Sequence, residues 1–183
     1  MTRADGRIIT VFGSGHLRGD DPHYSEAREL GAELAAKGFR VCSGGYGGVM
    51  EAASRGAKEA GGRTLGVTAE FFRSTANAWI DEQVRVKTWQ ERLFELVKRG
   101  DGYVTCPGGT GTLAELAVVW EMLNKGAMTR KPFVVLGDFW LPVVDLVSEV
   151  EFGRARDRGA KDAPLVHVAA APADAAAYLA ERL

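Results

Sequence analysis

The sequence has few of the features that mark exported, membrane-spanning or disulfide-rich proteins. Its 183 residues include two cysteines, Cys42 and Cys106. No apolar run approaches the roughly 20 residues that cross a bilayer. The first residues also lack an extended apolar stretch before a small-residue cleavage site, which is the pattern of a signal peptide. We therefore expect a cytoplasmic protein with reduced, buried thiols and no membrane contact.

An excess of charge of one sign is also missing. The 23 Lys and Arg residues oppose 24 Asp and Glu residues, which leaves a formal net charge of −1. Surfaces that bind nucleic acid are usually basic, so this balance disfavours nucleic acid as a partner. The histidines His16, His23 and His167 are scattered and the cysteines lie far apart, so no metal-ligand spacing is present. We expect neither a metal nor a cofactor.

Apolar, β-rich runs alternate with segments of helical periodicity along the chain. The expected strands are 7–12, 39–42, 63–68, 83–87, 102–106, 132–137 and 165–169. The expected helices are 22–37, 48–60, 89–99, 112–125, 142–151 and 174–183, with a charged loop at 153–164. Such alternation predicts a three-layer, Rossmann-like α/β fold, with a mostly parallel sheet and helices on both faces. The length suits a single nucleotide-binding domain over 1–183.

Three glycine-rich turns follow three of these strands. They are GSG at 13–15, SGGYGG at 43–48 and PGGTGT at 107–112. Parallel sheets bind ligands beyond the carboxyl ends of their strands, so we expect the turns to meet there. Glycine lets backbone N–H groups approach a ligand, and a helix N-terminus adds unpaired donors. One such turn is as often a simple tight corner, but three at one edge favour a phosphorylated ligand.

The predicted ligand-binding residues come from these turns. They are Gly13, Ser14, Gly44, Gly45, Gly108, Gly109, Thr110, Gly111 and Thr112. His16 either contacts the ligand or is solvated. Common nucleotide motifs do not account for the turns, because Arg18 occupies the third glycine position of G-x-G-x-x-G and no G-x-x-x-x-G-K-[ST] occurs.

A carboxylate, Glu115, follows the third turn at a distance of three residues from Thr112. Two interpretations stay open. Thr112 and Glu115 have the spacing of a capping box, in which the glutamate accepts a hydrogen bond from the N-cap N–H. Alternatively, the carboxylate points to the same mouth as the phosphate-binding amides. Because a phosphate would repel it, a carboxylate there is better suited to the ligand's sugar.

Arg92 lies on the helix before the third turn, in TWQERLFELVKRG. It is either a partner of Glu115 that also holds the ligand or a surface arginine beside Glu91 or Glu95. The spacing of residues in the sequence does not distinguish between these two interpretations.

The stretch PGGTGTLAE at 107–115 matches the signature PGGxGTxxE, and in this the chain resembles the LOG family of cytokinin riboside 5'-monophosphate phosphoribohydrolases. VFGSG (11–15), SGGYGGVMEAASRGAKEAGG (43–62) and ANAWIDEQ (77–84) also resemble that family, so the resemblance runs from about residue 7 to 137. Leu93, Ser43 and Glu51 replace the Lys, Gly and Gly of other members and indicate a bacterial subgroup. Such proteins are often labelled lysine decarboxylases, but nothing here marks a Schiff-base lysine.

The resemblance implies an enzyme that hydrolyses the N-glycosidic bond of a nucleoside 5'-monophosphate, AMP or an N6-modified AMP, to free base and ribose 5-phosphate. It implies that Arg92 and Glu115 are catalytic. Glu115 would stabilise positive charge on the ribose and orient or deprotonate water, while Arg92 keeps Glu115 ionised. The alternative is a non-catalytic nucleotide-binding or sensor protein.

The helix at 113–125 is apolar around more than one face. Such a helix is buried on several sides. Homodimerisation, which is the habit of the LOG family, would provide this burial. Cover by the C-terminal helices of the same chain is the other possibility.

Overall fold

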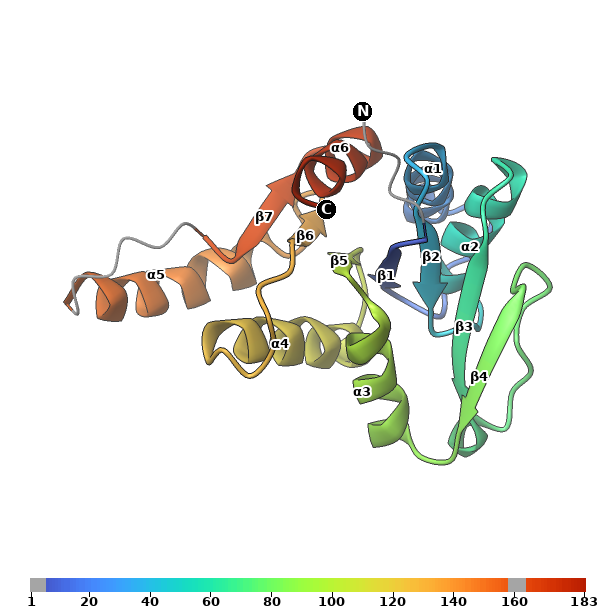
Figure 1. The fold of residues 1–183 in the computed structure, drawn as a ribbon, viewed down its shortest axis with the longest axis horizontal. Coiled ribbons are helices and arrows are strands. Elements are labelled where there is room, and N and C mark those ends of the chain that lie inside the picture. The colour runs from blue at the N-terminus through green and yellow to red at the C-terminus, as the bar shows by residue number, and fades with distance from the viewer. Residues whose placement is uncertain (1–5, 158–163) are drawn as a thin grey trace.

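The structure is a computed structural model that describes residues 6–157 and 164–183 (Figure 1). Its centre is a seven-stranded sheet in the order β4-β3-β2-β1-β5-β6-β7. The strands are β1 (Ile8–Phe12), β2 (Arg40–Ser43), β3 (Thr64–Ala69), β4 (Glu82–Val86), β5 (Gly102–Thr105), β6 (Phe133–Leu136) and β7 (Val166–Ala169). Every neighbouring pair of these strands is parallel.

Helices cover both faces of the sheet (Figure 1). They are α1 (Pro22–Ala36), α2 (Val49–Glu59), α3 (Trp89–Arg99), α4 (Thr110–Asn124), α5 (Leu141–Asp157) and α6 (Pro172–Arg182), with a short 3-10 turn, η1 (Glu70–Phe72), after β3. Side chains of α1, α2 and α6 share one core with the sheet, and those of α3, α4 and α5 share another. This arrangement confirms the predicted three-layer α/β fold.

The two cores exist because the parallel strands are buried on both faces. β1 serves both: Ile9 and Val11 belong to the core under α1, α2 and α6, and Phe12 belongs to the opposite core. There the ring of Tyr103 stacks on Phe12 at a centroid distance of 6.1 Å, and its hydroxyl donates a hydrogen bond to the Val97 carbonyl at 2.6 Å. This contact ties α3 to β5.

Local sequence signals explain where two of the helices begin. The Asp21 carboxylate accepts a hydrogen bond from the His23 N–H at 2.8 Å, and Pro22 supplies the fixed φ of the first position of α1. α3 begins with a capping box, in which the Thr88 hydroxyl accepts from the Glu91 N–H and the Glu91 carboxylate accepts from the Thr88 N–H. The second cap orients the helix that carries the predicted catalytic arginine.

The predicted element order matches the structure, and the largest difference in a boundary is at α5. The predicted helix ends at residue 151, whereas α5 continues to Asp157 into the loop predicted at 153–164. Arg and Ala are strong helix formers, and the single Gly153 in this stretch costs a helix only about 1 kcal/mol. The part of that predicted loop at 158–163 lies outside the described residues.

The two cysteines are free and buried, as predicted. Burial raises the pKa of the Cys42 thiol to about 12 and raises the pKa of the Cys106 thiol further still. Since the thiolate is the reactive form, both side chains are chemically quiet at neutral pH. Within the described residues, none of the helices is both long enough and apolar enough to cross a bilayer.

The order of the strands reverses direction at β1. From β1 the chain builds outward through β2, β3 and β4, and then α3 returns it to β5 on the other side of β1. Hydrogen bonds join the ends of the two central strands: the Cys106 N–H donates to the Phe12 carbonyl at 2.8 Å, and the Ser14 N–H donates to the Pro107 carbonyl at 3.0 Å. Open parallel sheets bind their ligands at such a reversal point.

Candidate active site

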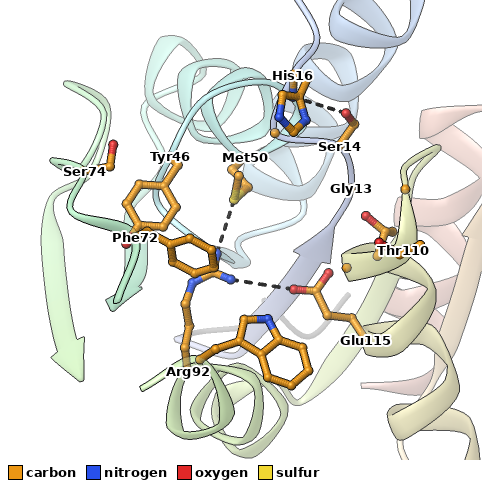
Figure 2. Close-up of a pocket in the computed structure, with 15 residues that line it drawn as sticks. Gly13, Ser14, His16, Tyr46, Met50, Phe72, Ser74, Arg92, Thr110 and Glu115 are labelled. Carbon is orange, nitrogen blue, oxygen red and sulfur yellow. Dashed lines mark hydrogen bonds and ion pairs between the residues drawn. The ribbon is translucent and has the colours of Figure 1, made fainter. Parts of the chain in front are cut away.

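A cavity of about 470 Å³ opens at this reversal point, beyond the carboxyl ends of β1 and β5 (Figure 2). Side chains and turns from all parts of the predicted site reach it. The predicted residues that line it are Gly13, Ser14, Arg92, Gly109, Thr110, Gly111, Thr112 and Glu115. Three others, Gly44, Gly45 and Gly108, do not line it. The glycines of the first and third turns therefore line the cavity, whereas the second turn reaches it through Tyr46.

One wall of the cavity is the N-terminus of α4. This helix begins at Thr110 with Gly109 as its N-cap, two residues earlier than predicted, and no side chain caps it. The first hydrogen bond of the helix is donated by the Leu113 N–H to the Gly109 carbonyl at 2.9 Å. The preceding amides of the first turn therefore point out of the helix end, where the helix dipole adds partial positive charge. This end suits a phosphate group.

Two glycines that do not line the cavity determine its shape. A Cβ atom at Gly44 would overlap the guanidinium of Arg92, and a Cβ atom at Gly108 would overlap the hydroxyl of Thr112. Each glycine provides the room that a cavity-facing side chain occupies.

Arg92 lies on the buried side of α3 and is 6% exposed. Its Nε donates a hydrogen bond to the Val67 carbonyl at 2.8 Å, and its Nη2 lies 3.4 Å from the sulfur of Met50. The guanidinium carbon is 5.3 Å from the ring centroids of both Tyr46 and Phe72. These contacts hold the cation in one place and leave Nη1 directed at the cavity.

The interpretation of Arg92 as a surface arginine is wrong. The Glu91 carboxylate is occupied by the capping box of α3, where it accepts from backbone N–H groups. Glu95 pairs with Arg99 at 2.6 Å. Neither neighbouring acid is the partner of Arg92, which pairs across the cavity instead.

That partner is Glu115, whose Oε1 lies 4.0 Å from Nη1 of Arg92 (Figure 2). The separation is that of an ion pair without a direct hydrogen bond, so both groups retain capacity to bind a ligand. The capping-box interpretation of Glu115 is also wrong. Because α4 starts at Thr110, Glu115 stands in the second turn, beyond the reach of the N-cap at Gly109.

The protonation of Glu115 is set by two opposing influences. Burial of its side chain, which is 14% exposed, raises the pKa, and the positive charge of Arg92 lowers it. Burial dominates, and the pKa of Glu115 reaches about 7. The family resemblance implied that Arg92 keeps Glu115 ionised. With this pKa, the carboxylate is only partly ionised at neutral pH. A carboxyl group with this pKa can both take and release a proton at neutral pH.

Several residues that line the cavity were not predicted from the sequence. They are Gly15, Tyr46, Met50, Phe72, Ser74 and Trp89. His16, for which ligand contact and solvation were both open, also lines the cavity. Tyr46 lies in the predicted glycine turn at 43–48. The available signal for Phe72 was the adjacent pair Phe71 and Phe72, between the expected strands 63–68 and 83–87. Exposed aromatic residues in a loop beside a sheet edge are a reasonable sign of a binding surface.

The chain is similar in sequence to several known proteins. The cytokinin riboside 5'-monophosphate phosphoribohydrolase of Mycobacterium marinum is 39% identical over 126 residues, which cover 65% of this chain and 66% of that protein. The enzyme of the same name from Mycobacterium tuberculosis is 36% identical over 117 residues, which cover 62% of each chain. An uncharacterized protein of Archaeoglobus fulgidus is 30% identical over 129 residues, with 70% of this chain and 83% of that protein covered.

Solved structures match over nearly the whole length. The Moco carrier protein from Chlamydomonas reinhardtii superposes with a TM-score of 0.74 at 29% identity, covering 96% of both chains. The molybdenum cofactor binding protein from Rippkaea orientalis superposes with a TM-score of 0.72 at 26% identity, covering 93% of both. The model of the SLOG cluster4 family matches residues 6–152. The LOG resemblance carried by PGGTGTLAE is therefore confirmed, and the chain belongs to the SLOG cluster4 family.

Proposed function

We propose that this protein hydrolyses the N-glycosidic bond of a nucleoside 5'-monophosphate, AMP or an N6-modified AMP, and releases the free base and ribose 5-phosphate. The observation that carries the proposal is the convergence of Glu115 and Arg92 beside the uncapped N-terminus of α4. The names of the mycobacterial relatives support it, at 36% and 39% identity.

In the proposed complex the phosphate binds the first turn of α4. The amides of Thr110, Gly111 and Thr112 and the two threonine hydroxyls are the donors available there. Anchoring the phosphate places the adjoining ribose over Glu115, which stands one turn further along the same helix. Arg92 balances the negative charge that phosphate and carboxylate bring together.

The proposed chemistry uses Glu115 twice. When the glycosidic C–N bond breaks, its electron pair leaves on the base and positive charge develops on the ribose, where an ionised Glu115 stabilises it. The same carboxylate takes a proton from water as the water oxygen bonds to the anomeric carbon. The departing base takes up a proton from solvent to become the free base. With a pKa of about 7, Glu115 releases its own proton to solvent at neutral pH and is ready for another cycle.

Arg92 is proposed to act through charge and position. Its side chain is held by the Val67 carbonyl and by the flanking rings of Tyr46 and Phe72. It therefore presents Nη1 to the cavity without reorganisation, which is the condition for strong electrostatic stabilisation in a site shielded from water.

A carrier function is the second candidate. Two of the solved structures, which match over 93% and 96% of the chain, are of proteins named for binding or carrying the molybdenum cofactor. A carrier would bind its ligand in the same cavity and release it unchanged. In that case the paired Glu115 and Arg92 would serve recognition alone.

Product analysis separates the two candidates. We expect the protein to convert AMP to free adenine and ribose 5-phosphate, detected by chromatography. A protein that binds AMP or the molybdenum cofactor tightly and releases no base from any tested monophosphate would instead be a carrier or sensor.

We also propose that two copies of the chain associate through α4. Leu113 and Ala117 are four residues apart on this helix, so they share a face, and both remain exposed in the chain. The C-terminal helices therefore do not cover that face. We expect Leu113→Asp to convert a dimer to a monomer in analytical ultracentrifugation, whereas Glu29→Gln, an exposed change on α1 at the other face of the sheet, should not. A wild-type monomer at micromolar concentration would contradict this proposal.

A further inference from the structure

The cavity has a second wall, formed by the rings of Tyr46 and Phe72, which we call the aromatic wall. Figure 2 shows it on the opposite side of Arg92 from Glu115 and Thr110. The two rings meet edge to face, with centroids 5.5 Å apart. Phe72 is 41% exposed even though it lines the cavity. Its ring therefore keeps apolar surface that a flat ligand can cover.

The aromatic wall is held in position by backbone contacts. The Tyr46 hydroxyl accepts a hydrogen bond from the Ala69 N–H at 2.9 Å and donates one to the Ala69 carbonyl at 3.1 Å. The Asn77 side chain donates to the Tyr46 carbonyl at 2.8 Å. These bonds join the second glycine turn to the segment that carries Phe72. A ligand ring that stacks here meets a surface that is already ordered.

The wall offers little means of reading the edge of a base. Among the described residues that line the cavity there is no Asn or Gln, the side chains that pair with the edge of adenine, and its charged side chains, Arg92 and Glu115, are assigned to the ribose in the proposed complex. The Tyr46 hydroxyl is already engaged with Ala69. Ser74 is the polar side chain that Figure 2 places beside the wall.

We propose that the base of the bound nucleotide lies against Tyr46 and Phe72 and is recognised by stacking rather than through its edges. The site would accordingly accept purine monophosphates whose edges differ, such as AMP and GMP. This inference rests on the proposed function, because it takes the phosphate to lie at α4. In Figure 2, Arg92 lies between the N-terminus of α4 and the aromatic wall. In a nucleotide, the ribose lies in the same way between the phosphate and the base.

Binding measurements in a Glu115→Gln protein test this inference without interference from hydrolysis. We expect Phe72→Ala to weaken AMP and GMP by about tenfold, since stacking on an aromatic side chain is worth that much or more. Ribose 5-phosphate has no base, so its affinity should stay unchanged. Phe72→Trp should preserve or strengthen nucleotide binding. AMP and GMP should bind within about threefold of each other.

Phe94→Ala is the matched control. Phe94 is also an exposed phenylalanine, at 54%, and it does not line the cavity, so its removal should leave all three affinities unchanged. The inference is overturned if Phe72→Ala leaves AMP binding intact. It is also overturned if Phe72→Ala weakens ribose 5-phosphate equally, because the ring would then act through Arg92, or if AMP and GMP differ more than about tenfold.

The same data distinguish this inference from the proposed function. If AMP binding depends on Phe72 but the wild-type protein releases no base, the stacking inference stands and the hydrolase proposal fails. If neither AMP nor ribose 5-phosphate binds, both fail together.

Discussion

The two walls of the cavity differ in how they are built. The α4 wall consists of backbone amides, hydroxyls and one largely buried carboxylate, all within a single stretch of sequence, 107–115. The aromatic wall is assembled from two separate segments that hydrogen bonds between Tyr46, Ala69 and Asn77 hold together. Arg92 stands between them and contacts both, through Glu115 on one side and two rings on the other.

This difference suggests a division of work between the walls. Polar groups at a helix terminus can hold a phosphate and act on the adjoining sugar, which requires exact placement. Flat apolar rings can hold a base with less demand on its identity. Changes on the α4 wall should therefore alter the rate of the chemical step, while changes on the aromatic wall should alter affinity.

The largest effect is expected for Glu115→Gln. Because the amide can neither take the proton from water nor balance charge on the ribose, kcat for AMP should fall about a thousandfold. Calorimetry should show that AMP still binds. Glu121→Gln, an exposed change on the same helix, is the control and should be silent. If Glu115→Gln hydrolysed AMP at the wild-type rate, the chemical role that we assign to the α4 wall would be wrong.

Arg92→Lys should have the next largest effect, about a hundredfold loss in kcat/KM. Lysine keeps the charge, but it lacks the planar guanidinium, which donates to the Val67 carbonyl and faces Glu115 at the same time. Both kcat and KM should change, because Arg92 contacts both walls. Arg99→Lys is the matched control, since Arg99 lies on the same helix and pairs only with Glu95 in the described contacts. Equal losses in the two variants would indicate damage to α3 rather than to the site.

A change of pH should have a smaller effect on activity, and this effect should come from Glu115 in the α4 wall alone. The pKa of Glu115 is raised from 4.5 to about 7, and the proposed chemistry needs the ionised form. We expect log(kcat/KM) for AMP to rise with pH up to about 7 and then level off, so activity at pH 6 should be about tenfold below the plateau. Phe72→Ala should keep the same profile at a lower height. A wild-type rate that is flat from pH 5 to 8 would contradict the role of Glu115 as base.

The same raised pKa has a consequence for stability. The folded protein binds a proton at Glu115 more tightly than the unfolded chain does, so the stabilisation from that proton is fully present below pH 4.5 and is lost as pH rises through about 7. Denaturant titrations at several pH values should show that the unfolding free energy of the wild type falls between pH 4.5 and about 7 relative to that of Glu115→Gln.

Much of the α4 wall was predictable from the sequence, and the aromatic wall was not. The glycine turn, the following helix and the acid at Glu115 are neighbours in the chain, so spacing alone places them together. Tyr46 and Phe72 are 26 residues apart in numbering, and the hydrogen bonds that align them form only when β2 and β3 are paired. The exact start of α4 also escaped prediction, because an uncapped helix that begins at Thr110 has no local signal to mark it.

The sequence by itself determined the order of strands and helices, the parallel sheet and the phosphate-suited turn at α4, because periodicity, glycine and helix termini act over short distances. Only the tertiary structure decided that Arg92 faces Glu115 rather than its helical neighbours, that Gly44 leaves room for the guanidinium, and that two rings complete the cavity. It also decided the pKa of Glu115, since burial depends on how separate elements pack around the carboxylate and outweighs the attraction of the nearby cation.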